Sequence, residues 1–544
     1  MSDGAILPEA IDRAQNGVAA WLPDGSGFFL TREREGTTPD STDRDLDMVA
    51  WLHRLGTDPS RDIRIAARGL DPAVGLERID IPTVVTAPGS DQVLLSAFGG
   101  GGSRRENPIW TTDLADAIKG RPRWRGVCAL EDKITNAVLS GRELYLVSEK
   151  TTPLGSVLRV DAAAPDLANA RVVVPEGRQS IQAIVAARDA VYLQLMDGGP
   201  NRLRRLAPDG RVTDIPMPFD AGVAREGLFA SADADGIDVR IAGWVQPSAI
   251  WHYGPGASGL TDTGLSPRPA IDLSPYLTTR IFATAKDGTR VPVSIVARRD
   301  TPQDGSAPLW MTAYGSYQFS TAPSFTPGFI AFLDAGGVMA TAHVRGGGEY
   351  GRPWWQAGKG PTKPNTWRDA IACAEALCAA KWTLPGRLTL MGTSAGGIMV
   401  GRAITERPDL FAGAVDNVGV VNVTRSEAER NGPPNYPEFG FPDREADFKA
   451  LAEMDAYQHV RDGVAYPAVL IVAGMSDPRV APWHGGKFAA RLQAANASGK
   501  PVLLRVDFDA GHGIGSTRRQ RDELLADIFA FTLWRAGKAR YQPA

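Results

Sequence analysis

The chain has few cysteines, no excess of charge of one sign and no long apolar run, and each absence excludes a class of protein. Its 544 residues include three cysteines, too few for a disulfide framework and without the paired spacing of a metal site. The 59 basic and 62 acidic residues leave a net charge of −3, which argues against nucleic acid as the main partner. No segment approaches the roughly 18 unbroken apolar residues of a membrane span, and the start, MSDGAILPEAIDRAQ, lacks the apolar core of a secretory signal. We therefore expect a soluble, cytoplasmic protein that binds neither nucleic acid nor membrane.

Glycine and proline are plentiful, at 59 and 40 residues, which is typical of many short strands joined by turns. A chain of 544 residues exceeds what one hydrophobic core supports, so two or more domains are expected. The sequence pattern changes near Ile271. We predict a β domain over residues 1–270 and an α/β domain over residues 271–544.

The first half repeats one pattern, in which a turn of Asp, Ser or Gly precedes alternating apolar residues, as in a strand with one buried face. The pattern recurs about every 50 residues, which is the interval of a four-stranded β-propeller blade. About five blade repeats can be counted. The alternative is an irregular β-sandwich whose strand spacing is coincidental. The recurring strands are centred on Phe28, Val93, Leu144, Val191 and Val239.

The second half alternates apolar strands with amphipathic helices, which indicates a mostly parallel sheet covered by helices on both faces. Residues Tyr276–Arg299 predict an opening hairpin. The expected strands are Pro308–Gly315, Gly336–Gly348, Arg387–Gly392, Ala468–Gly474 and Val502–Phe508, and the expected helices are Thr366–Ala380, Gly397–Pro408 and Trp483–Ala497.

A candidate nucleophile lies between one of these strands and the helix after it. The segment Gly392–Gly396, GTSAG, has the G-x-S-x-G pattern of a nucleophile elbow, whose tight turn needs small neighbours and strains the serine backbone. The Ser394 hydroxyl is then exposed at the carboxyl edge of the sheet, where the next helix N-terminus favours developing negative charge. The motif alone is a weak signal, but the strand before it and the helix after it make it specific.

A serine nucleophile needs a base, and histidine is the usual one. In α/β hydrolases the order along the chain is serine, acid, histidine, so three of the six histidines are candidates: His459, His484 and His512. His512 lies in a glycine-flanked loop after the strand ending at Phe508, at the same sheet edge as Ser394, and is the predicted base. His459 and His484 remain rivals, although their positions suit surface or packing roles better.

The acid is expected on the loop after the preceding strand. Asp477 is the first carboxylate after Gly474, and it would orient the imidazole and stabilise the imidazolium. Asp507 and Asp509 are rivals, but they share the strand and loop of His512 and are expected to be solvated.

Four segments of the second half carry specific motifs: HVRGGGEYGRPWWQAGK (His343–Lys359), GTSAGGIMVGRAITERPDLFAGAVDNVGVVN (Gly392–Asn422), SDPRVAPWHGGKFAARLQ (Ser476–Gln493) and AGHGIG (Ala510–Gly515). They are similar to the prolyl oligopeptidase family of serine peptidases. The similarity covers the whole α/β half and extends more weakly into the first half, in AAWLPDGSGFFLTR and WLHRLGTDPSRD. It implies an all-β propeller domain followed by an α/β-hydrolase domain, with the active site in the cavity between them.

The resemblance implies Ser394 as nucleophile, Asp477 as orienting acid and His512 as general base. It also implies an oxyanion hole made by the Tyr314 hydroxyl, together with the Ala395 N–H that the elbow geometry itself suggests.

Substrate-binding positions are implied in the same way. Arg479 matches an arginine that binds a substrate carbonyl, and its structural alternative is a local salt bridge. Val480, Phe439 and Tyr317 match positions that line the specificity pocket.

Asn435 is a departure from the family pattern. It stands in PPNYPEFG at the best match to the tryptophan on which proline-specific members stack the substrate proline ring. Loss of the indole removes a large, flat apolar contact, which puts strict cleavage after proline in doubt. Glu438, close by, would either attract a basic substrate side chain or fix a loop.

Length is the second departure. Full-size members of the family carry seven blades and an N-terminal arm, more than is found here. The resemblance therefore implies an incomplete propeller, either because the chain is a short form or because it starts late.

The leading hypothesis is a serine peptidase that hydrolyses short peptides through an acyl-enzyme on Ser394. An esterase or acylaminoacyl-peptide hydrolase with the same triad is the alternative, because these enzymes share the acyl chemistry. A non-catalytic binding protein is a third hypothesis, disfavoured by the intact serine, acid and histidine candidates. We expect no cofactor and no metal, since no His, Cys or Asp cluster has ligand spacing. The sequence does not indicate an oligomeric state.

Overall fold

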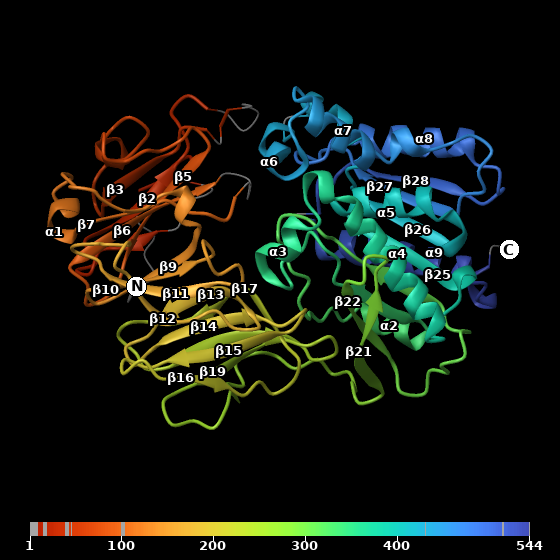
Figure 1. The fold of residues 1–544 in the computed structure, drawn as a ribbon, viewed down its shortest axis with the longest axis horizontal. Helices are drawn as coiled ribbons and strands as arrows, with labels where there is room; N and C mark the ends of the chain where they lie inside the picture. The colour runs from red at the N-terminus through yellow and green to blue at the C-terminus, as the bar shows by residue number, and fades with distance from the viewer. Residues whose placement is uncertain are drawn as a thin grey trace.

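The computed structural model describes residues 9–14, 19–37, 43–44, 46–99, 104–429, 431–513 and 516–542. The start of the chain through Pro8 and the Ile514–Gly515 end of the His512 loop therefore lie outside the described residues. Five four-stranded sheets occupy one side of the molecule, and an eight-stranded sheet with its helices occupies the other (Figure 1). All five smaller sheets precede the large sheet in the chain.

Each of the five small sheets is an antiparallel meander of consecutive strands. The five recurring apolar strands predicted from the sequence are the second strands of these sheets, β2, β6, β10, β14 and β18. The strands are β1 (Ala20–Trp21), β2 (Gly27–Arg32), β3 (Val49–Arg54), β4 (Ile63–Ala66), β5 (Asp80–Thr86), β6 (Gln92–Gly99), β7 (Ile109–Asp113), β8 (Arg125–Cys128), β9 (Ile134–Ser140), β10 (Glu143–Ser148), β11 (Ser156–Asp161), β12 (Arg171–Val174), β13 (Ser180–Ala186), β14 (Val191–Met196), β15 (Asn201–Leu206), β16 (Val212–Ile215), β17 (Gly222–Phe229), β18 (Ile237–Ala242), β19 (Ala249–Tyr253) and β20 (Thr261–Asp262).

Successive small sheets pack face to face, and an apolar core lies between each pair. Val147 and Val157 of the third sheet, for example, share a core with Ile184 and Leu193 of the fourth. Alternation of buried residues along each strand supplies one apolar row to each such contact. Because each sheet packs on the next one in the chain, the arrangement is that of propeller blades, and the alternative of an irregular sandwich is wrong.

The eight-stranded sheet has the order β21-β22-β24-β23-β25-β26-β27-β28. Its first two pairings are antiparallel and the rest are parallel, as expected from the strand–helix alternation. Its strands are β21 (Tyr276–Thr284), β22 (Arg290–Arg298), β23 (Leu309–Thr312), β24 (Val338–Ala342), β25 (Leu388–Thr393), β26 (Gly413–Asn417), β27 (Ala468–Gly474) and β28 (Val502–Asp507).

Helices cover both faces of this sheet because its strand residues point alternately to opposite sides. Val469 and Ile471 pack in the core that contains α4, α5 and α8, whereas Leu470 and Val472 pack against α2 and α9. The helices are α1 (Leu114–Ile118), α2 (Phe329–Asp334), α3 (Gly351–Gln356), α4 (Pro364–Ala379), α5 (Gly396–Glu406), α6 (Tyr436–Phe439), α7 (Glu445–Met454), α8 (Trp483–Ala495) and α9 (Arg518–Arg535). In the described part of the chain, no helix combines the length and the apolar character needed to cross a membrane.

A buried arginine joins the two halves. Arg352 of α3 is 6% exposed, and its guanidinium donates to Glu149 at 2.8 Å and to Glu106 at 2.6 Å. These two glutamates follow β10 and β6, so one side chain of the α/β half contacts two different blades. Figure 1 shows α3 on the side of the α/β half that faces the blades, so this helix ties the two halves together.

Candidate active site

Ser394 lies at the turn between β25 and α5, as the elbow motif predicts. Its φ angle is 57°, a left-handed conformation that is strained for a residue with a side chain. The neighbouring glycines are required by close approach: a Cβ on Gly392 would lie 2.1 Å from the Gly396 carbonyl, and one on Gly397 would lie 2.5 Å from the Val420 nitrogen. The local sequence therefore presents the serine hydroxyl at the carboxyl edge of the sheet.

A continuous chain of hydrogen bonds runs from Ser394 through His512 to Asp477. The Ser394 hydroxyl donates to His512 Nε2 at 2.9 Å, and His512 Nδ1–H donates to Asp477 Oδ2 at 2.7 Å. The second carboxylate oxygen, Oδ1, accepts the backbone N–H groups of Arg479 at 2.8 Å and Val480 at 3.0 Å. With its side chain only 1% exposed, Asp477 is fixed on both oxygens, so it holds the imidazole in a single orientation.

None of the rival histidines and carboxylates forms a hydrogen bond with Ser394 or His512 among the described residues. His484 is 1% exposed, and its Nδ1 accepts the Asn422 N–H at 3.1 Å while its Nε2 bonds Glu429. His459 Nδ1 donates to the Asp455 carbonyl at 2.8 Å. Asp507 accepts the N–H of Asp509 at 3.1 Å and does not contact His512 through a hydrogen bond.

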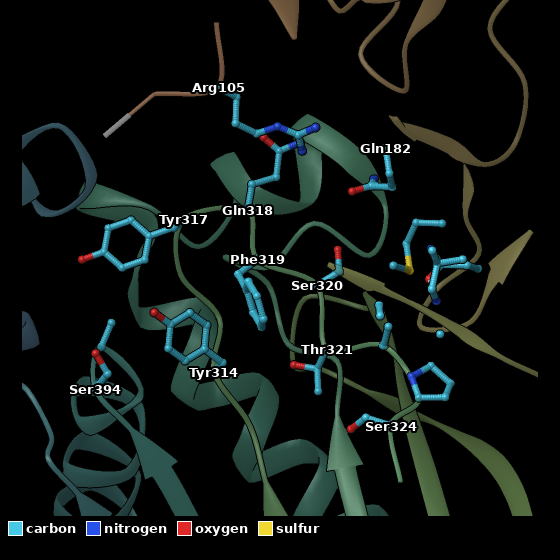
Figure 2. Close-up of a pocket in the computed structure, with 18 of the residues that line it drawn as sticks. Arg105, Gln182, Tyr314, Tyr317, Gln318, Phe319, Ser320, Thr321, Ser324 and Ser394 are labelled. Atoms are coloured by element: carbon cyan, nitrogen blue, oxygen red, sulfur yellow. The ribbon is translucent and has the colours of Figure 1, made fainter. Parts of the chain in front are cut away.

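Two donors converge beside the serine. Tyr314 follows β23, and burial raises the pKa of its hydroxyl to about 12, although the nearby Arg479 charge acts in the opposite direction. Figure 2 shows the Tyr314 hydroxyl directed toward Ser394. Ala395 is buried at the start of α5, and within the described chain no hydrogen bond engages its N–H. Both groups are placed to stabilise an oxyanion that forms next to Ser394 Oγ.

The loop that carries Tyr314 is held by buried charges. The fully buried Lys363 donates to the Gly315 carbonyl and to Ser316 Oγ, and burial lowers the pKa of its ammonium to about 8. Glu438, 4% exposed, accepts the Tyr317 N–H at 2.8 Å and Trp355 Nε1–H at 2.9 Å. Of the two roles considered for Glu438, the structure therefore places it as a loop-fixing carboxylate.

A cavity of about 830 Å³ opens at Ser394 between the two halves. Tyr317, Asn435, Arg479 and Val480 line it, as expected, and the Arg479 side chain forms no salt bridge with any described residue. Phe439 was expected at the wall but does not line the cavity. It is buried behind Tyr317, with ring centroids 5.5 Å apart, because the phenol of Tyr317 covers it.

Other lining residues carried no recognisable signal in the sequence. Val420 faces the cavity from a segment that the family motif includes, so its position could have been considered. The propeller residues Arg105, Gln182 and Met196 could not be identified from the sequence, because they come from three separate segments and form no motif. Within the described ranges, no group of three or more His, Cys, Asp or Glu side chains is arranged to hold a metal ion.

Two family models match the chain, one in each half. Residues 1–258 match the family model described as the prolyl oligopeptidase N-terminal beta-propeller domain. Residues 323–539 match the model described as the prolyl oligopeptidase family.

Curated relatives align along almost the whole chain. Dipeptidyl aminopeptidase BI of Pseudoxanthomonas mexicana is 35% identical over 561 residues, which cover 99% of this chain and 72% of that protein. Prolyl endopeptidase of Elizabethkingia meningoseptica is 26% identical over 524 residues, which cover 95% of this chain and 72% of that protein.

Solved structures show the same fold. A structure from a study of two prolyl endopeptidases superimposes with a TM-score of 0.86 at 28% sequence identity. The match covers 97% of this chain and 76% of that chain. Prolyl oligopeptidase B from Galerina marginata, bound to a 25mer macrocyclization substrate, has a TM-score of 0.88 at 23% identity, covering 98% and 74%, and supports the fold alone.

Proposed function

Since this chain belongs to the prolyl oligopeptidase family and is a serine-type peptidase, we propose that Ser394, His512 and Asp477 are the triad with which it hydrolyses short peptides. The observation that carries the proposal is the continuous hydrogen-bonded chain from Ser394 Oγ to the Asp477 carboxylate. The strained φ of 57° at Ser394 supports it, because such strain is kept at functional positions.

The geometry accounts for each step of an acyl transfer. His512 Nε2 takes the Ser394 proton as Oγ attacks the scissile carbonyl, and Asp477 stabilises the imidazolium that forms. The Tyr314 hydroxyl and the Ala395 N–H donate to the tetrahedral oxyanion. His512 then gives its proton to the leaving amine, which leaves an ester on Ser394. In the second half of the reaction His512 takes a proton from water as the water attacks the ester, and it then returns that proton to Ser394 Oγ while the peptide acid leaves.

The cavity wall favours a broad rather than a strictly post-proline specificity. Asn435 offers an amide where an indole would be needed to stack on a proline ring, and that amide accepts the Tyr317 hydroxyl at 2.8 Å. Glu438 is buried and already accepts two N–H donors, so it does not select for a basic residue before the scissile bond. We propose that apolar residues from alanine to phenylalanine are accepted there alongside proline.

A panel of fluorogenic peptides tests this proposal, with Pro, Ala, Phe or Arg before the scissile bond and a simple ester alongside. We expect the Pro, Ala and Phe peptides to be cleaved with kcat/KM values within about tenfold of one another, and the Arg peptide more slowly. Cleavage of the Pro peptide alone would contradict the broad specificity. Hydrolysis of the ester without any peptide would contradict the peptidase proposal, and Ser394→Ala controls for contaminating activity.

We also propose a cytoplasmic location. All three cysteines, Cys128, Cys373 and Cys378, are free thiols in the structure, which suits a reducing compartment. Labelling of these thiols in the protein as isolated from its cells tests the proposal.

A further inference from the structure

One polar part of the cavity takes no part in the acyl chemistry. We call it the Arg105 corner, and it consists of Arg105, Gln182, Gln318 and Ser320, all of which line the cavity that contains Ser394. Arg105 lies between β6 and β7 and Gln182 lies on β13, so two blades contribute, whereas Gln318 and Ser320 belong to the loop after β23. Figure 2 shows Arg105 and Gln318 extending toward each other, with Ser394 apart from them beyond Tyr314.

The charge of Arg105 is not used within the protein. Its side chain forms no hydrogen bond or ion pair with any residue that the structure describes. The adjacent Arg104 differs, since its guanidinium bonds Asp80 and lies 3.5 Å from Glu77. Both arginines line the cavity, but Arg104 is neutralised within its blade and only Arg105 keeps an unpaired charge.

The nearby carboxylates do not neutralise Arg105. No described residue that lines the cavity is an aspartate or a glutamate. Glu349, behind the loop, accepts the Thr321 N–H at 2.9 Å, and Glu438 accepts the Tyr317 N–H. The cavity therefore presents a net positive surface, from Arg105 and Arg479, to whatever occupies it.

Gln318 supplies an independent observation that points to a ligand. It is 4% exposed, yet neither its Oε1 nor its Nε2 has a hydrogen-bond partner in the described structure, and Ser320 Oγ is equally unpartnered. A buried amide without partners costs free energy that a bound polar group would recover after a small rotation of the side chain. Its φ of 56° shows that the loop holds this residue in place despite backbone strain.

We propose that the Arg105 corner binds a carboxylate of the peptide substrate, an inference that rests on the proposed peptidase function. The planar guanidinium matches a carboxylate with two parallel N–H donors. The Gln318 amide extends toward Arg105 and is a further donor, and the Ser320 hydroxyl is another donor in the same cavity. Two sources share this chemistry: an acidic side chain at one position of the peptide, and the free C-terminal carboxylate. In either case the enzyme selects acidic over neutral peptides.

Paired peptides separate the two sources. One series is N-acetylated and C-amidated and carries a single Glu, or Gln in its place, moved through successive positions on both sides of the scissile bond. A second series has no acidic side chain and ends in either a free acid or an amide. The ratio of kcat/KM between the acidic and the neutral member of each pair is measured for wild type, Arg105→Gln, Arg105→Glu and Arg171→Gln. Arg171 is the matched control, because it is exposed on β12 and does not line the cavity.

We expect an acidic-to-neutral ratio of about tenfold at one side-chain position or at the free C-terminus, which identifies the source. The ratio should fall to about one in Arg105→Gln, fall below one in Arg105→Glu and persist in Arg171→Gln. A ratio of one for every pair in the wild type, or a ratio that Arg105→Gln leaves unchanged, would overturn the proposal.

Binding to Ser394→Ala keeps this test separate from the proposed function. Dissociation constants of the same peptides, measured by calorimetry with the inactive variant, should show the same preference of about tenfold and its loss in Ser394→Ala/Arg105→Gln. If the wild type cleaves no peptide, the proposed function fails. The ratio of dissociation constants between acidic and neutral peptides still shows whether the Arg105 corner binds a carboxylate. Equal binding of acidic and neutral peptides would overturn the proposal that the Arg105 corner binds a carboxylate, even if the protein is an active peptidase.

Discussion

The hydroxyl of Tyr317 donates a hydrogen bond of 2.8 Å to Oδ1 of Asn435, and the two side chains together form one wall of the cavity at Ser394. The backbone of Tyr317 is in the left-handed region, at a φ of 59°, and is held there by the bond from its N–H to Glu438. This wall of the cavity is therefore a phenol bonded to an amide, with the ring of Phe439 behind it.

Replacing Asn435 by tryptophan should increase the preference for proline. An indole in this position offers a flat apolar face to the pyrrolidine ring, and we expect the kcat/KM ratio of Pro to Ala peptides to rise by about tenfold, the value of one aromatic contact. Asn435→Leu is the matched control, because it is apolar but lacks the flat ring. An equal rise in both variants would show that loss of the amide, and not the stacking surface, is responsible.

Asp477→Asn should lower kcat by about 10⁴-fold with little change in KM, because the amide holds the imidazole in the wrong tautomer. Steady-state kinetics on one peptide measure this effect. Asp507→Asn serves as the control, since Asp507 neighbours the His512 loop but bonds the Asp509 N–H instead. If Asp507→Asn lost most of its activity while Asp477→Asn kept it, the acid that orients His512 would be Asp507, and the proposed role of Asp477 would be wrong.

Tyr314→Phe should reduce kcat by about 10²- to 10³-fold, the usual effect of removing one oxyanion donor. Burial raises the pKa of Tyr314 to about 12, so the phenol stays protonated and remains a donor in the range in which peptidases are assayed. Ionisation of Tyr314 should therefore not lower the wild-type rate below pH 10. An unchanged kcat in Tyr314→Phe would remove this residue from the oxyanion hole.

Asp416→Asn should stabilise the protein at pH 8 and have little effect at pH 4. Asp416 lies fully buried on β26, neither carboxylate oxygen has a partner among the described residues, and burial raises its pKa to about 7. Because the folded state retains this proton between pH 4 and 7 while the unfolded chain releases it, the wild type loses stability as the pH rises, by about 1–3 kcal/mol. Thermal unfolding from pH 4 to 8.5 measures the difference, with the exposed Asp443→Asn as control. If the stability difference between Asp416→Asn and the wild type grew toward acidic pH, the pKa of Asp416 would not be raised in the folded protein.

Arg352→Met should destabilise the protein by about 3 kcal/mol, because it leaves the buried carboxylate of Glu149 without its partner. Denaturant unfolding measures the change. Adding Glu149→Gln should restore part of the loss, since the unpaired charge is then removed. Purely additive effects of the two substitutions would show that the pair is not coupled across the two halves.

The local features of the chain could be predicted from its sequence. The second strand of each blade was found because alternation of apolar residues and turn chemistry act over a few neighbouring residues. The elbow at Ser394 was found for the same reason: a strand-to-helix turn in which backbone atoms approach within van der Waals contact admits only small residues at Gly392 and Gly397. The order of residues along the chain and their positions after strands at one edge of the sheet then reduce the candidates for the base to His512 and those for the acid to Asp477.

Contacts between distant segments could not be predicted in this way. From the sequence alone, Glu438 could either attract a basic substrate side chain or fix a loop. The fold distinguishes these roles, because it brings the Glu438 carboxylate within 2.8 Å of the backbone nitrogen of Tyr317, which is 121 residues away in the chain. Phe439 was expected at the cavity wall, but packing placed the Tyr317 ring in front of it. The Arg105 corner has no sequence signal, because the distance between its members depends on how two blades and one loop pack together. The sequence by itself determined the elements and the chemistry available at the sheet edge, because these depend on neighbouring residues. The tertiary structure decided which polar groups are neutralised by partners and which are left facing the cavity, because those contacts join segments that are distant in the chain.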